Sequence, residues 1–162
     1  MIGFETIGNA TVTVFDGLET VLTTDPWING NPYFGSWGHK YSIPKEQKEN
    51  ILNAKYIWLS HGHPDHIDSV SLDLMSKKIF LIPDHYGDRI FNDFRSNKFN
   101  CIKVKSNEWI ELSKNIRIKS FADWNQDATL LIEINKNTIL LNLNDGMGYG
   151  WQNTIKKIIK EY

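Results

Sequence analysis

The chain has a single cysteine, Cys101, among its 162 residues, so it can form no internal disulfide, and nothing indicates an oxidising compartment. Its longest apolar stretches, such as Thr138 to Leu143, have the length of a strand and are far too short to cross a bilayer. The N-terminus lacks the basic start and apolar run of a signal peptide. We therefore expect a cytoplasmic protein that does not insert into a membrane.

The sequence also has no excess of positive or of negative charge. Eighteen Lys and Arg residues against 19 Asp and Glu residues give a formal net charge of −1, and no basic cluster adjoins an aromatic run. Nucleic acid is therefore not an expected partner. A Gly-rich phosphate loop is absent, as is a Ser/His/Asp or Cys/His nucleophile pattern, and Cys101 lies in an apolar stretch typical of an inert core residue. The frequent Asn, Ile and Lys residues are typical of AT-rich bacterial genomes, which is an association only.

The length and the 41% hydrophobic content predict one globular domain covering residues 1–162. Strands fall in two groups, each accompanied by helices, which predicts an α/β fold with a two-layered sheet core and helices outside. A loop at 25–43, rich in Gly, Asn, Pro and aromatic residues, is long enough to suggest a functional role. Strands are expected near 10–15, 19–24, 55–60, 79–82, 101–104, 108–112, 116–121, 128–134 and 138–142, and helices near 44–54, 69–76, 86–95 and 154–162.

Three of the five histidines fall within the segment Ser60 to Asp68, whose sequence is Ser-His-Gly-His-Pro-Asp-His-Ile-Asp. Imidazole and carboxylate are the preferred ligands of a divalent transition metal when no thiolate is present. The segment directly follows a strand of the buried type, which would hold the ligands rigidly. A His-rich surface loop is the alternative, and this spacing after a core strand favours a metal site.

The pattern resembles the His-x-His-x-Asp-His signature of the metallo-β-lactamase superfamily. The resemblance implies an αββα sandwich of two mixed sheets with outer helices. It assigns His61 and His63 to a first metal, and Asp65 and His66 to a second.

Two further residues match the superfamily by their position after a strand. The resemblance makes Asp145 the ligand that bridges the two metals, with an ordinary turn before Gly146 as the alternative. Asp25 would orient a ligand histidine without binding the metal itself, with an Asp-Pro turn as the alternative.

Two histidines of the superfamily pattern are absent, because no histidine follows His85. Where the third ligand of the first metal is expected, only Asp123, Asn125, Gln126 and Asp127 could donate, and the distance to the next strand favours Asp123. A carboxylate there would shift the preference from zinc toward iron or manganese. The last ligand is missing because the sequence ends one helix after Asp145, so the C-terminal half is incomplete, either in a fragment or in a shortened member with an open second site. An open side would leave strand edges or apolar surface where a homo-oligomer could form.

A narrower resemblance rests on Thr24 to Trp27, Gly35 to Gly38, the histidine segment and Thr138 to Asp145. Together they are similar to the branch that contains the CMP-N-acetylneuraminate hydroxylases and related sugar-nucleotide proteins. In that branch the metal fold works beside a Rieske iron–sulfur centre as an oxygenase. A Rieske centre needs two cysteines, so this chain would need a separate electron donor.

The histidine segment and the resemblance leave three alternative functions. The first is a metal-dependent hydrolase that uses water activated by one or two ions, with zinc the first expectation, and with Asp65 orienting the nucleophile or shuttling a proton. The second is an iron-dependent sugar-nucleotide hydroxylase, and the third is a non-catalytic metal-binding remnant. The expected substrate is a small molecule, with sugar nucleotides and carbohydrate derivatives as candidates. Trp27 and Trp37 are candidate substrate contacts, with packing within the loop as the alternative for each. His39 and His85 are candidate substrate contacts as well, and a surface or packing role is the favoured alternative for both.

Overall fold

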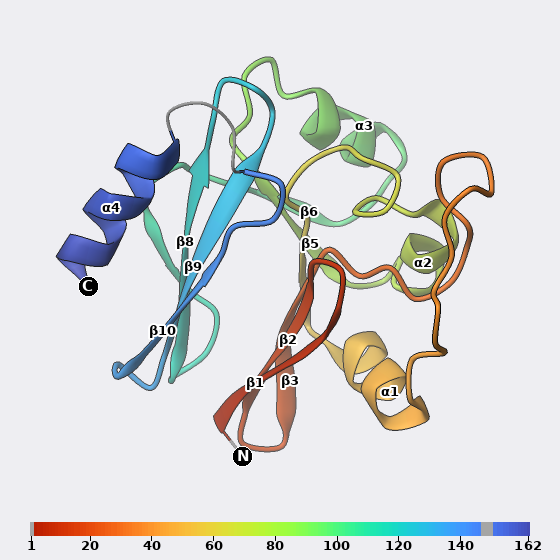
Figure 1. Cartoon of the computed structure of the whole chain (residues 1–162), viewed down its shortest axis with the longest axis horizontal. Helices are drawn as coiled ribbons and strands as arrows, with labels where there is room; N and C mark the ends of the chain where they lie inside the picture. Colours follow the sequence, from red (N-terminus) through yellow and green to blue (C-terminus); the bar gives the residue numbers. More distant parts are fainter. Residues whose placement is uncertain (1, 147–150) are drawn as a thin grey trace.

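The computed structural model describes residues 2–146 and 151–162, in which two sheets face each other and helices cover their outer sides (Figure 1). Within this part of the chain, no helix has both the length and the apolar character needed to cross a membrane. The elements are β1 (Ile2–Gly8), β2 (Thr11–Asp16), β3 (Glu19–Thr24), α1 (Lys45–Asn53), β4 (Tyr56–Trp58), α2 (Ser69–Leu74), β5 (Ile79–Pro83), α3 (Arg89–Ser96), β6 (Cys101–Val104), β7 (Trp109–Glu111), β8 (Ile116–Ala122), β9 (Ala128–Ile134), β10 (Thr138–Asn142) and α4 (Trp151–Glu161).

The first sheet has six strands in the order β1-β2-β3-β4-β5-β6. Its first three strands pair antiparallel through hairpins, and β3 to β6 run parallel. Parallel strands end at the same edge of a sheet, and ligands bind beyond this edge in open α/β sheets. The residues that directly follow β3, β4 and β5 therefore meet there.

The second sheet has four strands in the order β10-β9-β8-β7, and all of its pairs are antiparallel. The expectation of two mixed sheets is therefore wrong for this layer as far as the structure describes it. The reason is local, because short turns join β7 to β8, β8 to β9 and β9 to β10, and a short turn can join only antiparallel neighbours. The αββα arrangement itself is confirmed, with α1, α2 and α3 outside the first sheet and α4 outside the second (Figure 1).

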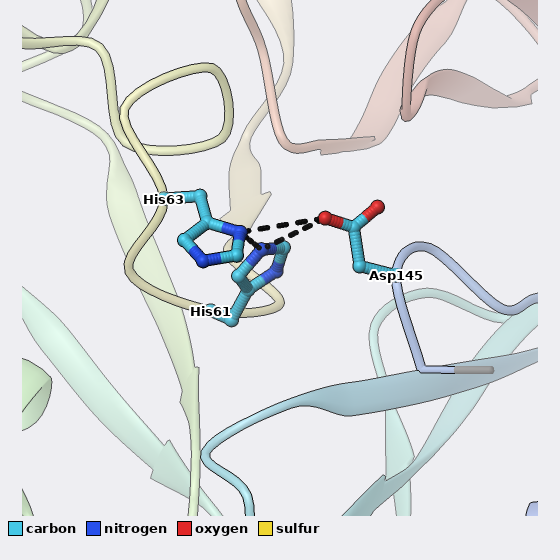
Figure 2. Close-up of side chains that lie close together, drawn as sticks. All are labelled: His61, His63 and Asp145. Carbon is cyan, nitrogen blue, oxygen red and sulfur yellow. Dashed lines mark hydrogen bonds and ion pairs between the residues drawn. The ribbon is translucent and has the colours of Figure 1, made fainter. Parts of the chain in front are cut away.

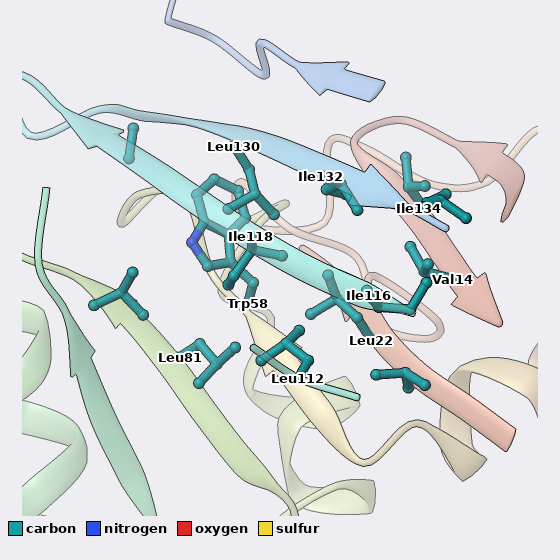
Figure 3. Close-up of a cluster of buried hydrophobic side chains, with 14 residues drawn as sticks. Val14, Leu22, Trp58, Leu81, Leu112, Ile116, Ile118, Leu130, Ile132 and Ile134 are labelled. Carbon is teal, nitrogen blue, oxygen red and sulfur yellow. The ribbon is translucent and has the colours of Figure 1, made fainter. Parts of the chain in front are cut away.

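The main core lies between the two sheets, where Trp58 and Leu81 of the first sheet meet Ile118 and Leu130 of the second (Figure 3). Trp58 is fully buried. A second apolar cluster, which includes Phe80 and residues of α1, α2 and α3, holds these helices on the other face of the first sheet. The strand that leads into the histidine segment is thus buried on both faces, as its continuous apolar run predicts.

Two helix boundaries and one strand differ from the expectations. Helix α3 begins at Arg89 and not near residue 86, because Asp88 has a left-handed backbone (φ 56°) that starts the helix late. Strand β1 was not expected as a separate element, since its burial alternates only between exposed and half-buried residues. Helix α4 begins at Trp151 and not at Thr154.

Candidate metal centre

The histidine segment leaves the end of β4 and enters α2 within a few residues. Its backbone is fixed by a turn in which the His63 carbonyl accepts the N–H groups of His66 (3.0 Å) and Ile67 (2.8 Å). The Asp68 side chain then accepts the Ser71 N–H (2.7 Å) and caps α2. Both ends of the segment are therefore held before any ligand binds.

Three donor atoms converge at this segment. His61 Nε2 and His63 Nδ1 lie 2.7 Å apart, and Asp145 Oδ2 approaches them to 3.3 and 3.4 Å from the end of β10 (Figure 2). Ligands around a tetrahedral ion with bonds of roughly 2.0 to 2.1 Å lie roughly 3.4 Å apart. The spacing and the imidazole and carboxylate chemistry fit a divalent metal ion. We call these three residues the first group.

A second group lies beside the first. His66 Nε2 is 3.5 Å from Asp65 Oδ2 and 3.8 Å from Asp145 Oδ2, and both His66 and Asp65 are buried. The same Asp145 oxygen thus faces the donors of both groups. This is the arrangement expected of a bridging carboxylate.

Asp25 lies behind the second group, at the end of β3. Its side chain is fully buried, with Oδ1 accepting the Ser60 N–H (2.7 Å) and Oδ2 lying 3.2 Å from His66 Nδ1. Burial opposes protonation of His66, but the neighbouring carboxylates, Asp25 foremost, outweigh it and raise the pKa of His66. Since Nδ1 faces Asp25, Nε2 is the nitrogen that remains for a ligand.

The hydroxyl of Ser60 lies between the two groups. Ser60 Oγ is 2.9 Å from His61 Nδ1 and 3.2 Å from His66 Nδ1, and the residue is fully buried. It therefore contacts the rear nitrogen of one histidine from each group and fixes how both rings are turned.

Asp65 is held by two donors from distant parts of the chain. Tyr33 Oη donates to its Oδ1 (2.8 Å), and Asn9 Nδ2 donates to its Oδ2 (3.1 Å). Burial opposes ionisation of Asp65, but these hydrogen bonds and His66 lower its pKa overall. Burial and the contact with Asp65 raise the pKa of Tyr33 to about 12, so this hydroxyl remains a donor.

The loop of residues 123–127, called the acidic loop below, lies on the far side of His61. Asp127 Oδ1 is 3.7 Å from His61 Nδ1. Asp123 Oδ1 accepts the N–H groups of Asn125 (2.8 Å) and Asp127 (2.9 Å) and so closes the turn. Asp123 is not among the converging donors, and its proposed role as a metal ligand stays a prediction.

Two of the candidate substrate contacts pack on each other. The rings of Trp27 and His39 lie 4.2 Å apart, and His39 Nε2 is 3.0 Å from the Trp27 carbonyl oxygen. Trp27 is buried, whereas Trp37 is half exposed and its ring lies 4.7 Å from that of Tyr33. Contact of these residues with a substrate stays a prediction.

Sequence reasoning missed the hydrogen bonds that Asn9 and Ser60 make to the donor residues, because no local pattern distinguishes either residue. It also missed the hydrogen bond from Tyr33 to Asp65, although Tyr33 belongs to the long loop for which a functional role was expected. Ser60 directly precedes the motif, yet nothing in its position indicates that its hydroxyl contacts two histidines.

Known proteins resemble the chain in sequence and in fold. No protein-family model matches the chain. A cytidine monophosphate-N-acetylneuraminic acid hydroxylase from Asterias rubens is 29% identical over 129 residues, which cover 80% of this chain, and one from Cricetulus griseus is 26% identical over 128 residues. The chain spans 17% and 23% of the length of these two proteins.

Solved structures show the same fold. CmlA, a diiron beta-hydroxylase from Streptomyces venezuelae, superposes with a TM-score of 0.71 over 96% of this chain and 32% of its own, at 14% identity. An isothiocyanate hydrolase from Delia radicum gut bacteria gives 0.58 over 81% of this chain and 58% of its own, also at 14% identity. The chain has the metallo-β-lactamase fold, and it resembles curated CMP-N-acetylneuraminic acid hydroxylases in sequence.

Proposed function

We propose that the chain is a metal-dependent enzyme whose two metal positions share Asp145 and act on a small molecule. The observation that carries this proposal is the convergence of His61 Nε2, His63 Nδ1 and Asp145 Oδ2 within 2.7 to 3.4 Å. His61, His63 and Asp145 would hold the first ion, and Asp65, His66 and Asp145 the second. A divalent ion bound here would lower the pKa of a water molecule and polarise a carbonyl or phosphoryl oxygen.

The protein's own residues would supply orientation. Asp25 and Ser60 fix the rear nitrogens of His66 and His61, so the front nitrogens are presented without rearrangement. Asp65 has a lowered pKa and both of its oxygens are engaged, which suits an orienting carboxylate better than a proton shuttle. Tyr33, which donates to Asp65, also lines a groove between residues 30–34 on one side and Pro64 and residues 67–70 on the other, where a substrate could lie.

Hydrolysis is the first candidate reaction, because it needs only water besides the metal. A small-molecule ester, amide or phosphodiester would be the substrate class. The isothiocyanate hydrolase among the structural neighbours is consistent with hydrolysis on this fold.

Hydroxylation is the second candidate, and two observations favour it. The donor set is rich in carboxylates, with Asp65 and Asp145 in the two groups and Asp127 beside His61, which suits iron better than an all-imidazole site would. The curated relatives are named hydroxylases of a sugar nucleotide, and CmlA is named a diiron hydroxylase. A sugar nucleotide is the substrate class that this candidate implies, with electrons from a separate donor.

One set of measurements tests both candidates. Protein purified without chelator is analysed for metal identity and stoichiometry. It is then assayed with zinc on ester and phosphodiester substrates, and with iron, a reductant and a CMP-sugar for dioxygen uptake. Zinc with hydrolytic turnover supports the first candidate, and iron with substrate-dependent dioxygen uptake supports the second.

The double variant H61A/H63A is the control for both assays. Loss of metal and of turnover is the expected result. Unchanged metal content and unchanged thermal stability would refute the metal centre and both reactions.

A further inference from the structure

Asp145 reaches the candidate metal centre from the second sheet, whereas the other donors belong to the histidine segment, which follows a strand of the first sheet (Figure 2). It lies on a turn after β10, which is the edge strand beside β9. The side chain of Asp145 is 52% exposed, so packing around it does not fix the carboxylate. The distance from this carboxylate to the histidines therefore depends on how the end of β10 is tied to the first sheet.

Asn142, the last residue of β10, makes such a tie. Its Nδ2 donates to Thr24 Oγ1 (3.1 Å) and to the Ala10 carbonyl (3.5 Å), which lie 118 and 132 residues away in the sequence. Thr24 is fully buried, and its hydroxyl donates to the Ala10 carbonyl (2.7 Å) and accepts the Val12 N–H (3.0 Å). The acceptors on the first sheet are therefore fixed by the hairpin β2–β3, and Thr24 directly precedes Asp25 at the metal centre.

The other end of the same amide holds the turn that carries Asp145. Asn142 Oδ1 accepts the Asn144 N–H (3.3 Å), and Asn144 Nδ2 donates to the carbonyl of Ala128, the residue after the acidic loop (3.4 Å). These partners also fix which way the amide of Asn142 is turned, because the Ala10 carbonyl can only accept and the Asn144 N–H can only donate. One side chain thus joins the first sheet to the turn of the bridging carboxylate.

We propose that Asn142 is a positioning residue for Asp145: its amide ties the turn after β10 to Thr24 and so holds the carboxylate where both metal groups can share it. The inference rests on the proposed function, because it assumes ions that share Asp145. Groups that orient a metal ligand without touching the ion contribute to metal affinity. A role limited to capping the turn is the alternative, and it requires the bond to Asn144 but not the bond to Thr24.

The test compares Asn142→Leu, which removes both ends of the contact, with Asn142→Ser. A serine hydroxyl still accepts the N–H two residues on, but it is too short to reach Thr24, so this variant keeps the cap and loses the tie. Cobalt(II) affinities are measured by visible absorption and by competition with a chelator. We expect both variants to weaken the ions of both groups by about 10- to 100-fold, since loss of an outer partner has this effect.

The matched control is Leu140→Ala in the same strand, whose side chain packs against the main core. L140A should lower the melting temperature and leave both affinities unchanged. A double-mutant cycle with Asp145→Asn then tests whether Asn142 acts through Asp145. N142L should weaken the ions in the wild type but add little to the loss in D145N, because residues that act through one contact are not additive.

The outcomes separate the inference from the proposed function. N142S protein that binds both ions as wild type does would overturn the inference alone, and so would additive losses in the cycle. Wild-type protein that binds no ion would overturn the proposed function and the inference with it. If N142L does not fold, N142S replaces it in the cycle, since it keeps the cap of the turn.

Discussion

Asp25 Oδ2 lies 3.2 Å from His66 Nδ1 in a place where neither side chain reaches solvent. The backbone of Asp25 is left-handed (φ 39°), and its N–H donates to the Trp58 carbonyl (2.8 Å), which locks the end of β3 to the end of β4. The carboxylate therefore has one orientation, with one oxygen on the Ser60 N–H and the other on His66. An acid in this place fixes which nitrogen of His66 faces the metal centre.

The variant Asp25→Asn tests this orientation. Asn tolerates a left-handed backbone and keeps the oxygen that accepts the Ser60 N–H, so the fold should persist. The negative charge that raises the pKa of His66 is lost, and we expect the second-group ion to bind about 10- to 100-fold more weakly. Isothermal titration of zinc into metal-free protein measures the affinity, and histidine NMR measures the pKa of His66, which should fall.

The comparison variant is Asp25→Ala, which also leaves the buried Ser60 N–H without its acceptor. An unsatisfied buried donor costs about 1–3 kcal/mol, so D25A should unfold at lower urea than D25N. Equal stability of the two variants would contradict the role of Asp25 Oδ1 in the fold.

The second prediction concerns Ser60, whose hydroxyl contacts a histidine from each metal group. We expect Ser60→Ala to weaken both ions, whereas a ligand variant such as His63→Ala should weaken the first alone. The matched control is Ser120→Ala, since Ser120 is fully buried and its hydroxyl has no hydrogen-bond partner in the described part of the chain. Chelator competition gives both affinities, and a wild-type profile for S60A would refute the shared role.

The sequence predicted the site residues that lie close together along the chain, and it missed the contacts made by residues far from them. His61, His63, Asp65 and His66 lie within one short segment, so their spacing alone indicated a common centre. The hydrogen bond from Asn9 to Asp65 spans 56 residues, and that from Tyr33 spans 32. Such contacts depend on how the hairpin β1–β2 and the long loop pack against the edge of the sheet. A local sequence pattern does not predict this packing.

The sequence likewise predicted some elements of the fold and missed others. The continuous apolar run before the histidine segment predicted β4, because this strand contacts both apolar clusters of the protein. The edge strand β1 was missed as a separate element because edge strands contact the core on one side only. The late start of α3 depends on the backbone of Asp88, a residue that hydrophobic periodicity does not distinguish.

A third prediction concerns stability at acid pH. Asp16, at the end of β2, accepts hydrogen bonds from Ser113 Oγ (2.6 Å) and Asn115 Nδ2 (2.8 Å), and these lower its pKa below the usual value of an aspartate side chain. A group whose pKa is lower in the folded state stabilises the fold above its unfolded pKa, and this contribution disappears as the pH falls through the folded value. The wild type should therefore lose stability below about pH 4 more steeply than Asp16→Asn.

Urea unfolding at a series of pH values measures this difference, with Asp73→Asn on the exposed side of α2 as the charge-matched control. The D73N curve should remain parallel to that of the wild type. Parallel curves for wild type and D16N would mean that the two hydrogen bonds do not persist in solution.

The last prediction separates a bridging carboxylate from an ordinary ligand. Asp145 Oδ2 lies 3.3 Å from His61 Nε2 and 3.8 Å from His66 Nε2, so Asp145→Asn should weaken the ions of both groups. His63 is close to the first group only, so His63→Ala should reduce the stoichiometry by one ion and leave the second-group affinity near that of the wild type. Both side chains are more than half exposed, so neither change should disturb the metal-free fold, which circular dichroism checks. A one-ion loss in D145N that matches the loss in H63A would place Asp145 in the first group alone, and the shared centre would then be wrong.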